Sequence, residues 1–324
     1  MVDRLIIDTD PGVDDMVAII AALHTPELDV VGLTTVGGNV PLEVTTRNAL
    51  CILARVGRLD IPVYAGLTAN HTAAHVHGDD GMAGCPWPVA SVTAQEATAE
   101  EYLTGMLEKG GVTLACLGPL TNVAAVLRAR PSLAGGLDEV VIMGGGFGTY
   151  AFEAGKGRVD SRGNVTGEAE FNIYSDVAAA RTVFGSGVKV TVAPLDISQR
   201  TLVSRRRLGD LDVEVAGMLD RYADFSRDKW GHTDGPLHDP NVIAYLAEPD
   251  LYSGLKGTVR VSNEGRTDFD SGPGPHKVLL RVDEEGYLDW VWEHMGAAGL
   301  RKRGVAERRN VVLPWPAVTP YSGS

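Results

Sequence analysis

The sequence predicts an α/β fold with an open, mostly parallel central sheet flanked by helices. Short apolar runs, which are typical of buried strands, alternate along the chain with stretches whose apolar residues recur at helical spacing. This alternation of strand and helix is the pattern of parallel sheets, which need a helix to cross from one strand to the next. The chain has neither an internal repeat nor a low-complexity linker, so we expect a single domain over residues 1–324.

The predicted elements follow one another as strand and then helix from the start of the chain. The predicted strands comprise residues 5–7, 29–35, 61–64, 112–117, 140–143 and 188–193. The predicted helices comprise residues 13–23, 42–56, 96–109, 120–130 and 176–184. Pro131 ends the fourth helix, because proline has no amide hydrogen for the helical ladder. A polar loop is expected over residues 66–91, a further helix over 241–246, and sheet-like runs over 257–261 and 277–282.

Composition and charge exclude several classes of protein. The 324 residues include 29 Lys and Arg against 42 Asp and Glu, a formal net charge of −13, which disfavours a nucleic-acid partner. No apolar run approaches the roughly 20 residues that a membrane span needs, and residues 1–10 lack the basic and then apolar pattern of a signal peptide. The three cysteines share no metal-binding spacing. We therefore expect a cytoplasmic enzyme with no nucleic-acid or membrane partner.

Four of the predicted strands end in polar, Gly-rich or Pro-containing segments. These segments are residues 8–10, 37–39, 117–119 and 143–145. Ligands of open parallel sheets bind outside the carboxyl ends of the strands. The four segments are therefore expected to border one crevice.

The strongest local signal is a group of four aspartates within eight residues, at the turn from the first strand to the first helix. Asp8, Asp10, Asp14 and Asp15 make up this group. Asp14 can cap the helix and Asp15 can favour its positive end, but capping explains only one or two of the four. Like charges this close repel one another unless a cation lies among them. We therefore predict a hard divalent metal ion with oxygen ligands.

A second acidic segment, His238-Asp239-Pro240, has two interpretations. Proline favours the first position of a helix, so Asp239 can be the capping residue of the helix that follows. Asp239 can equally be a third carboxylate ligand of the metal, with the neighbouring His238 as a proton donor.

Seven segments of the chain form an ordered set of motifs. They are Asp8–Asp15, Thr35–Asn39, His77-Gly78, Leu117–Asn122, Val141–Gly145, Ala169–Asn172 and His238–Pro240. In this set and this order the sequence resembles the nucleoside hydrolases, the inosine–uridine-preferring ribohydrolases, over about residues 5–250. The ordered set makes the resemblance specific.

The resemblance implies an enzyme that cleaves the N-ribosidic bond of nucleosides to free base and ribose, and that forms homodimers or homotetramers. It implies one Ca²⁺, held by the carboxylates of Asp10, Asp15 and Asp239 and the backbone carbonyl of Leu117. Asp10 is then the base that activates water, and His238 the acid that protonates the leaving base. Sugar hydrolysis of this kind passes through an oxocarbenium-like state.

The resemblance also implies a set of residues that contact the nucleoside. The ribose hydroxyls are expected at Asp14, Asn39 and Asn172, and the 5′ end at Asn164 and Glu170. Met143 is expected to pack against the sugar, while His77, Phe171 and His238 face the base.

Two parts of the sequence depart from the family pattern. The Gly-rich stretch over residues 144–163 is longer than expected. The charged segment over residues 200–233, which includes Trp230, has no clear alignment with the family pattern. Because this region lines the base pocket in the family, the preferred base stays open.

Two other classes of function compete with the hydrolase. Asp8 and Asp10 after a strand also resemble the nucleophile motif of haloacid-dehalogenase-type phosphatases, which use Mg²⁺. That interpretation leaves the segments around Glu170 and Asp239 without a role. The second competitor is a catalytically silent nucleoside-binding protein, and it conflicts with the presence of every catalytic residue that the resemblance implies.

Overall fold

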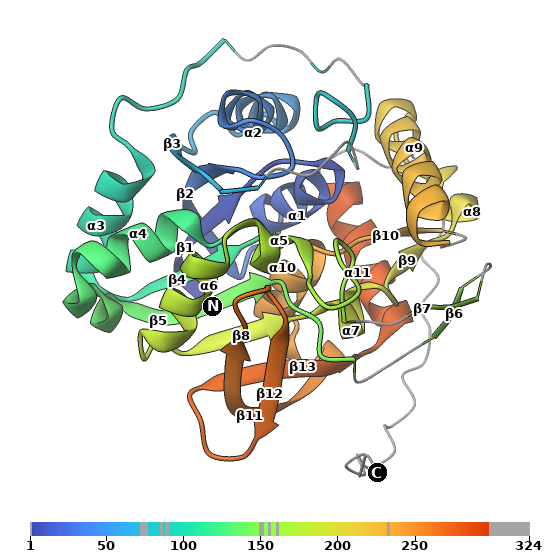
Figure 1. Ribbon diagram of the computed structural model, residues 1–324. Coiled ribbons are helices and arrows are strands. Elements are labelled where there is room, and N and C mark those ends of the chain that lie inside the picture. Colours follow the sequence, from blue (N-terminus) through green and yellow to red (C-terminus); the bar gives the residue numbers. More distant parts are fainter. Residues whose placement is uncertain are drawn as a thin grey trace, which may run out of the picture.

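The computed structural model describes residues 2–71, 77–84, 87, 91–148, 152–154, 157–159, 162–231 and 234–297. Its centre is a nine-stranded sheet (Figure 1). In their spatial order across the sheet, the strands are β12 (Thr267–Ser271), β11 (Tyr252–Val261), β13 (His276–Val282), β8 (Val190–Ala193), β5 (Leu137–Met143), β4 (Val112–Cys116), β1 (Val2–Thr9), β2 (Leu28–Gly37) and β3 (Val63–Thr68). Strands from β13 to β3 pair in parallel, while β11 pairs antiparallel with both β13 and β12.

The helices follow the strands in the order that the sequence predicts. They are α1 (Val13–Leu23), α2 (Leu42–Val56), α3 (Ala99–Lys109), α4 (Thr121–Ala129), α5 (Phe171–Ser175), α6 (Val177–Gly185), α7 (Leu195–Ser198), α8 (Arg205–Leu208), α9 (Val213–Trp230), α10 (Pro240–Ala247) and α11 (Glu284–Ala297). The remaining described elements are two 3₁₀ helices and two short strand pairs. The 3₁₀ helices are η1 (Pro131–Gly136) and η2 (Pro249–Leu251). The strand pairs are β6 (Phe152–Ala154) with β7 (Gly157–Val159), and β9 (Leu202–Val203) with β10 (Gly235–Pro236).

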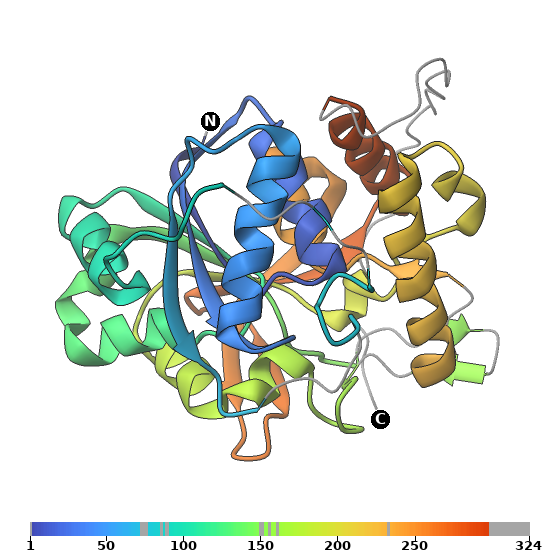
Figure 2. The same ribbon diagram turned by 90° about the horizontal axis from the view of Figure 1, so that it is seen from above.

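Helices cover both faces of the sheet, and each face has its own hydrophobic core. Because side chains alternate along a strand, Leu5 and Ile7 of β1 face one core and Ile6 faces the other. On the first face α1 packs against α2, α10 and α11, and Figure 2 shows α1 and α2 side by side. On the second face α4 packs against α3 and α6. The predicted α/β class, with an open and mostly parallel sheet flanked by helices, is confirmed.

The predicted element boundaries differ from the structure by a few residues. The third strand begins at Val63 rather than at residue 61. Residues 58–61 form a turn instead, in which the amide of Ile61 donates to the carbonyl of Arg58. The third helix begins at Ala99 rather than at residue 96, because the Thr98 side chain accepts from the amide of Glu101 and caps the helix there. Of the segment 200–233, which the sequence left unassigned, the structure describes residues 200–231, and these contain β9, α8 and α9.

One sheet joins strands from residue 2 to residue 282. The boundaries 1–324 of a single domain stay a prediction, because residues 298–324 lie outside the described part. In the part of the chain that the structure describes, no helix has the length and apolar character needed to cross a membrane.

Asn122 ties together the carboxyl ends of three neighbouring strands. Its side chain is fully buried, and its Nδ2 donates to Asp8 Oδ1 of β1 at 2.8 Å and to the carbonyl of Thr35 of β2 at 3.0 Å. Its Oδ1 accepts from the amide of Leu67 of β3 at 2.9 Å. The strand ends that carry the candidate site are therefore fixed to one another by a single side chain at the start of α4.

We expect Asn122→Ala to lower the free energy of unfolding by about 3 kcal/mol, because buried polar groups that lose their partner cost about 1–3 kcal/mol each. Urea denaturation followed by circular dichroism measures the change. Asn70→Ala is the control, since Asn70 is exposed and its replacement should stay within about 0.5 kcal/mol of the unmodified protein. Equal losses for the two variants would contradict the bridging role of Asn122.

Candidate active site

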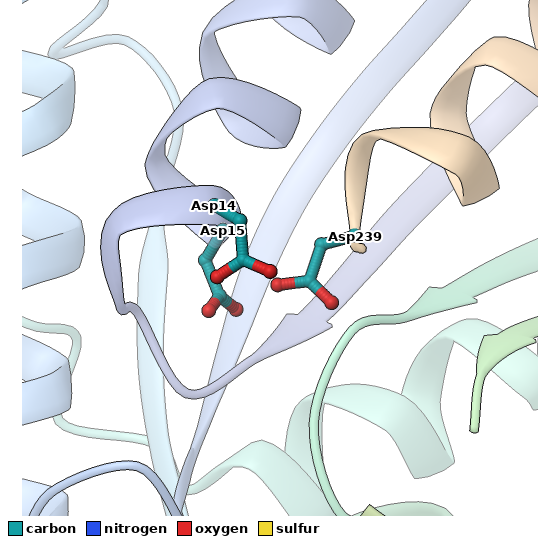
Figure 3. A group of neighbouring side chains, drawn as sticks. All are labelled: Asp14, Asp15 and Asp239. Atoms are coloured by element: carbon teal, nitrogen blue, oxygen red, sulfur yellow. The ribbon is translucent and has the colours of Figure 1, made fainter. Parts of the chain in front are cut away.

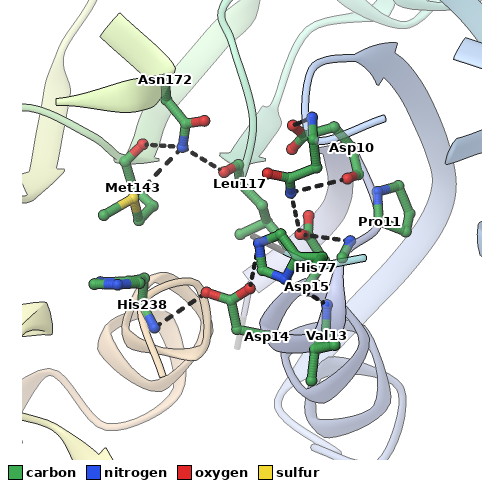
Figure 4. Close-up of polar contacts among 12 residues, drawn as sticks. Asp10, Pro11, Val13, Asp14, Asp15, His77, Leu117, Met143, Asn172 and His238 are labelled. Atoms are coloured by element: carbon green, nitrogen blue, oxygen red, sulfur yellow. Dashed lines mark hydrogen bonds and ion pairs between the residues drawn. The ribbon is translucent and has the colours of Figure 1, made fainter. Parts of the chain in front are cut away.

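The candidate site lies where the order of the strands reverses, between β1 and β4. Figure 4 shows its polar contacts. Asp10 follows β1, Asn39 follows β2, and Leu117 follows β4 directly. Met143 is the last residue of β5. The structure thus brings the predicted polar strand ends to one edge of the sheet.

The turn from β1 to α1 places its aspartates by backbone hydrogen bonds. Gly12, not Asp14, is the capping residue of α1, so the predicted capping role of Asp14 is wrong. The Asp15 carboxylate completes the cap, because its Oδ2 accepts from the amide of Gly12 at 2.9 Å. Its Oδ1 accepts from the hydroxyl of Thr9 at 2.6 Å. Capping therefore accounts for one of the four aspartates.

Three carboxylates from opposite ends of the chain face one another (Figure 3). Oxygen atoms of Asp14, Asp15 and Asp239 lie within 4.8 Å of one another, and all three residues are buried. Burial and the charge of Asp15 raise the pKa of Asp14 to about 7. Burial and the charges of Asp14 and Asp15 raise the pKa of Asp239 well above its ordinary value. Such a group favours bound protons or a bound cation over three free negative charges.

Asp239 precedes α10 at the capping position, yet its side chain makes no capping hydrogen bond within the described residues. Its carboxylate points instead toward Asp14 and Asp15 (Figure 3). Of the two interpretations of Asp239, the geometry thus favours the one in which it joins the aspartates near the start of the chain.

Asp10 lies beside this cluster, in a position that two glycines leave open. Its Oδ2 accepts from the amide of Asn39 at 2.7 Å, whereas its buried Oδ1 has no hydrogen-bond partner among the described residues. A Cβ atom on Gly38 would lie 2.2 Å from Oδ2, and one on Gly118 would lie 2.3 Å from Oδ1. Burial and the charge of Asp15 raise the pKa of Asp10 well above its ordinary value.

Asp8 has hydrogen-bond partners of its own in the sheet and in α4. Its Oδ1 accepts from the hydroxyl of Thr34 at 2.6 Å and from Asn122, and the side chain is fully buried. Burial raises the pKa of Asp8 to about 6. Its other oxygen, Oδ2, is also buried and has no hydrogen-bond partner among the described residues.

Asn172, near the start of α5, connects two of the strand ends. Its Nδ2 donates to the carbonyl of Leu117 at 2.7 Å and to the carbonyl of Met143 at 3.1 Å (Figure 4). Asn39 makes a similar link, since its Nδ2 donates to the carbonyl of Asp10 and to Asp15 Oδ2. Asn39 therefore contacts the carboxylate cluster directly, whereas Asn172 contacts the carbonyls of the two strand ends.

Glu170 caps α5 with its side chain. Oε1 accepts from the amide of Asn172, and Oε2 accepts from the amides of Ile173 and of Gly145. Burial raises the pKa of Glu170 to about 7, against the effect of these three donors. Asn164 Oδ1 accepts from the amide of Phe171 at 2.9 Å, so the predicted contacts to the 5′ end of a nucleoside lie next to α5.

The two predicted histidines lie on either side of Asp14 (Figure 4). The amide of His238 donates to Asp14 Oδ2 at 3.3 Å, and His77 Nε2 lies 3.8 Å from Asp14 Oδ1. His77 Nδ1 accepts from the amide of Val13 at 3.2 Å, and this places the ring proton on Nε2.

Two residues at the site escaped the sequence analysis. Ser198 of α7 lies with its hydroxyl 2.8 Å from His238 Nδ1. Tyr222 of α9 stacks on the ring of His77, with ring centroids 5.0 Å apart. Neither residue stands in a motif, and only the fold brings them to the histidines. The side chain of Trp230 lies outside the described part of the chain, as do seven residues of the Gly-rich stretch 144–163.

Comparison with known proteins identifies the family. The model of the inosine-uridine preferring nucleoside hydrolases matches residues 5–289. The chain belongs to this family. It is 36% identical to the pyrimidine-specific ribonucleoside hydrolase RihA of Salmonella arizonae, over 90% of this chain and 97% of that protein.

Solved structures of nucleoside hydrolases have the same fold. A plant nucleoside hydrolase superposes with a TM-score of 0.80 at 30% identity, over 91% of this chain and 99% of that one. A purine-preferring ribonucleoside hydrolase from Gardnerella vaginalis gives a TM-score of 0.79 at 29% identity, with the same coverage. The predicted membership of the nucleoside hydrolases is confirmed, and with it the assignment to the hydrolases of N-glycosyl bonds.

We expect Gly118→Ala to lower the free energy of unfolding by about 1–3 kcal/mol, because its Cβ would displace the Asp10 carboxylate. Urea denaturation measures the change. In the matched control, Gly105→Ala, the Cβ meets nothing within 4 Å inside α3, and stability should rise by up to about 1 kcal/mol. If both variants were stabilised alike, Gly118 would not be required for the position of Asp10.

Proposed function

We propose that this protein hydrolyses the N-glycosidic bond of ribonucleosides to free base and ribose, in a reaction that depends on Ca²⁺. One observation carries the proposal: buried carboxylates from both ends of the chain meet at the reversal point of a parallel sheet in a member of this family. Burying several negative charges without a compensating cation costs free energy, so the cluster favours the binding of a cation.

The donor set fits a calcium ion. In our proposal the ligands are the carboxylates of Asp10, Asp15 and Asp239 together with the carbonyl oxygen of Leu117. All of them are oxygen atoms, which hard cations prefer, and Oδ1 of Asp10 has no hydrogen-bond partner among the described residues. The carbonyl of Leu117 accepts from Asn172 and has a second lone pair for a cation.

The groups around the cluster suit a ribose ring. We propose that Asp14, Asn39 and Asn172 bind the ribose hydroxyls. Asp14 belongs to the cluster, Asn39 contacts Asp15, and Asn172 contacts the carbonyl of the proposed ligand Leu117. Asn164 and Glu170 are then the contacts of the 5′ end. Met143 packs against the sugar, and its Sδ lies 3.4 Å from Asn172 Nδ2.

In the proposed mechanism two side chains move protons. Asp10 accepts a proton from the attacking water, and His238 donates one to the leaving base, with His77 and Phe171 facing the base. General acid or base catalysis by one such group contributes about 10²–10⁴-fold. When bound, Ca²⁺ orients the water and two vicinal hydroxyls of the sugar. The surrounding carboxylates stabilise the positive charge that develops on the ribosyl group.

The preferred base stays open in this proposal. The relative from Salmonella arizonae is named pyrimidine-specific, and the solved hydrolase from Gardnerella vaginalis is named purine-preferring. Both are similar to this chain over at least nine-tenths of its length. A homodimeric or homotetrameric state and a cytoplasmic location also remain predictions from the sequence.

A base-release assay over purine and pyrimidine ribonucleosides, with and without a chelator, tests the reaction and the metal together. We expect release of free base and ribose, abolished by the chelator and restored by Ca²⁺. Asp10→Ala should lose both Ca²⁺ binding and turnover, whereas Asp29→Ala, at an exposed position of β2, should keep both. Full activity of the chelated protein or of Asp10→Ala would refute the calcium site. Binding of nucleosides without release of base would instead indicate a silent binding protein.

His238→Ala separates protonation of the leaving base from the other steps. Turnover of purine nucleosides should fall about 10²-fold or more, because purines leave more easily when protonated. Hydrolysis of a nitrophenyl riboside should stay within a few fold, because nitrophenolate leaves without an acid. Steady-state kinetics on the two substrates measure the difference. An equal loss on both would remove His238 from the role of acid.

A further inference from the structure

Asn48 is a buried amide that no motif singles out, and it connects the aspartate turn to a second loop. It belongs to α2, and its side chain is only 3% exposed. Its Nδ2 donates to the carbonyl of Pro11 at 3.1 Å and to the carbonyl of Asp80 at 2.8 Å. One nitrogen atom therefore holds two segments that lie 37 and 32 residues away along the chain.

The first segment is the turn that carries the carboxylate cluster, since Pro11 lies between Asp10 and the capping residue Gly12. The second is the loop over residues 77–84, which begins at His77. This loop closes on itself, because Asp80 Oδ1 accepts from the amides of Met82 and Gly84. The amide of Ala83 also donates to the carbonyl of His77 at 2.8 Å. The loop is thus held together by its own hydrogen bonds, and Asn48 attaches it to the aspartate turn at Asp80.

The geometry requires an asparagine at this position. A primary amide offers two hydrogens on one nitrogen, so that each carbonyl receives its own donor. A serine offers one hydrogen, and an aspartate at neutral pH offers none. The fit against the loop is also close, because a Cβ on Gly81 would lie 2.8 Å from Asn48 Nδ2 and 3.0 Å from the carbonyl of Pro11. Gly81 has a φ of +74°, which glycine adopts without strain.

We propose that Asn48 is a positioning residue of the active site. It fixes the 77–84 loop on the aspartate turn, so that His77 keeps its contact with the amide of Val13 and its place beside Asp14. Without this link the loop shifts, and the His77 ring no longer has one fixed orientation toward the base of the nucleoside. The role of His77 toward the base rests on the proposed function, whereas the position of the loop does not.

Hydrogen exchange tests the position of the loop without any catalytic activity. In Asn48→Ala, the amides of Gly81 and Ala83, which donate within the loop, should exchange at least ten times faster. Cys51→Ala is the matched control, because Cys51 is buried in the hydrophobic core one turn further along α2. That control should leave exchange in residues 77–84 unchanged. Unchanged exchange in Asn48→Ala, or equal acceleration in both variants, would overturn the proposal. Asn48→Ser keeps one hydrogen-bond donor, so its amides should exchange at a rate between those of the unmodified protein and Asn48→Ala. This variant replaces Asn48→Ala in the test if the alanine variant fails to fold.

A double-mutant cycle tests the action through His77. We expect His77→Ala to lower kcat/KM for nucleosides about ten-fold in the unmodified protein, but less than two-fold in the Asn48→Ala background. In the Cys51→Ala background it should again cost about ten-fold. The same loss in all three backgrounds would mean that Asn48 does not act through His77. If the unmodified protein released no base, the proposed function would fail, while the exchange experiment would still decide the position of the loop.

Discussion

Electrostatic repulsion among buried carboxylates is the constraint on which the rest of the site depends. Asp10, Asp14, Asp15 and Asp239 all lie at most 4% exposed, and burial raises the pKa of three of them. A protein that keeps such a group needs a rigid frame and a compensating positive charge. The fold supplies the frame through backbone amides, through the helix start at Gly12 and through glycines that make room for Asp10. A divalent cation would supply the charge.

The parallel sheet explains how these groups meet. Parallel strands place their carboxyl ends at one edge, and the strand order reverses between β1 and β4, which is where open parallel sheets bind their ligands. Helix α10 packs against α1, and this contact brings His238 to Asp14 although the two residues are 224 positions apart. The cluster is therefore a property of helix packing as much as of the strands that end beside it.

Asparagine amides are the connectors of the site. Asn122 joins three strand ends, Asn172 joins β4 to β5, and Asn39 joins both ends of the aspartate turn. Asn48 makes the same kind of link from the turn to the 77–84 loop. An amide can donate two hydrogen bonds from one uncharged group, so it fixes buried carbonyls without adding to the negative charge. Neutral donors of this kind suit the surroundings of a cluster of buried carboxylates.

The sequence by itself determined the α/β class, most of the elements and the identity of the family, because local periodicity and an ordered set of motifs are written along the chain. It also placed Asp10 and Leu117 at strand ends and Asp15 in the first turn of the first helix. It offered Asp14 as a possible capping residue of α1, whereas in the tertiary structure Gly12 caps the helix and Asp15 accepts the amide hydrogen of Gly12, since capping depends on backbone angles. Only the tertiary structure decided that Asp239 faces Asp14, that Ser198 meets His238 and that Tyr222 covers His77. These contacts join segments far apart in the chain, and no local pattern encodes the packing of one helix against another.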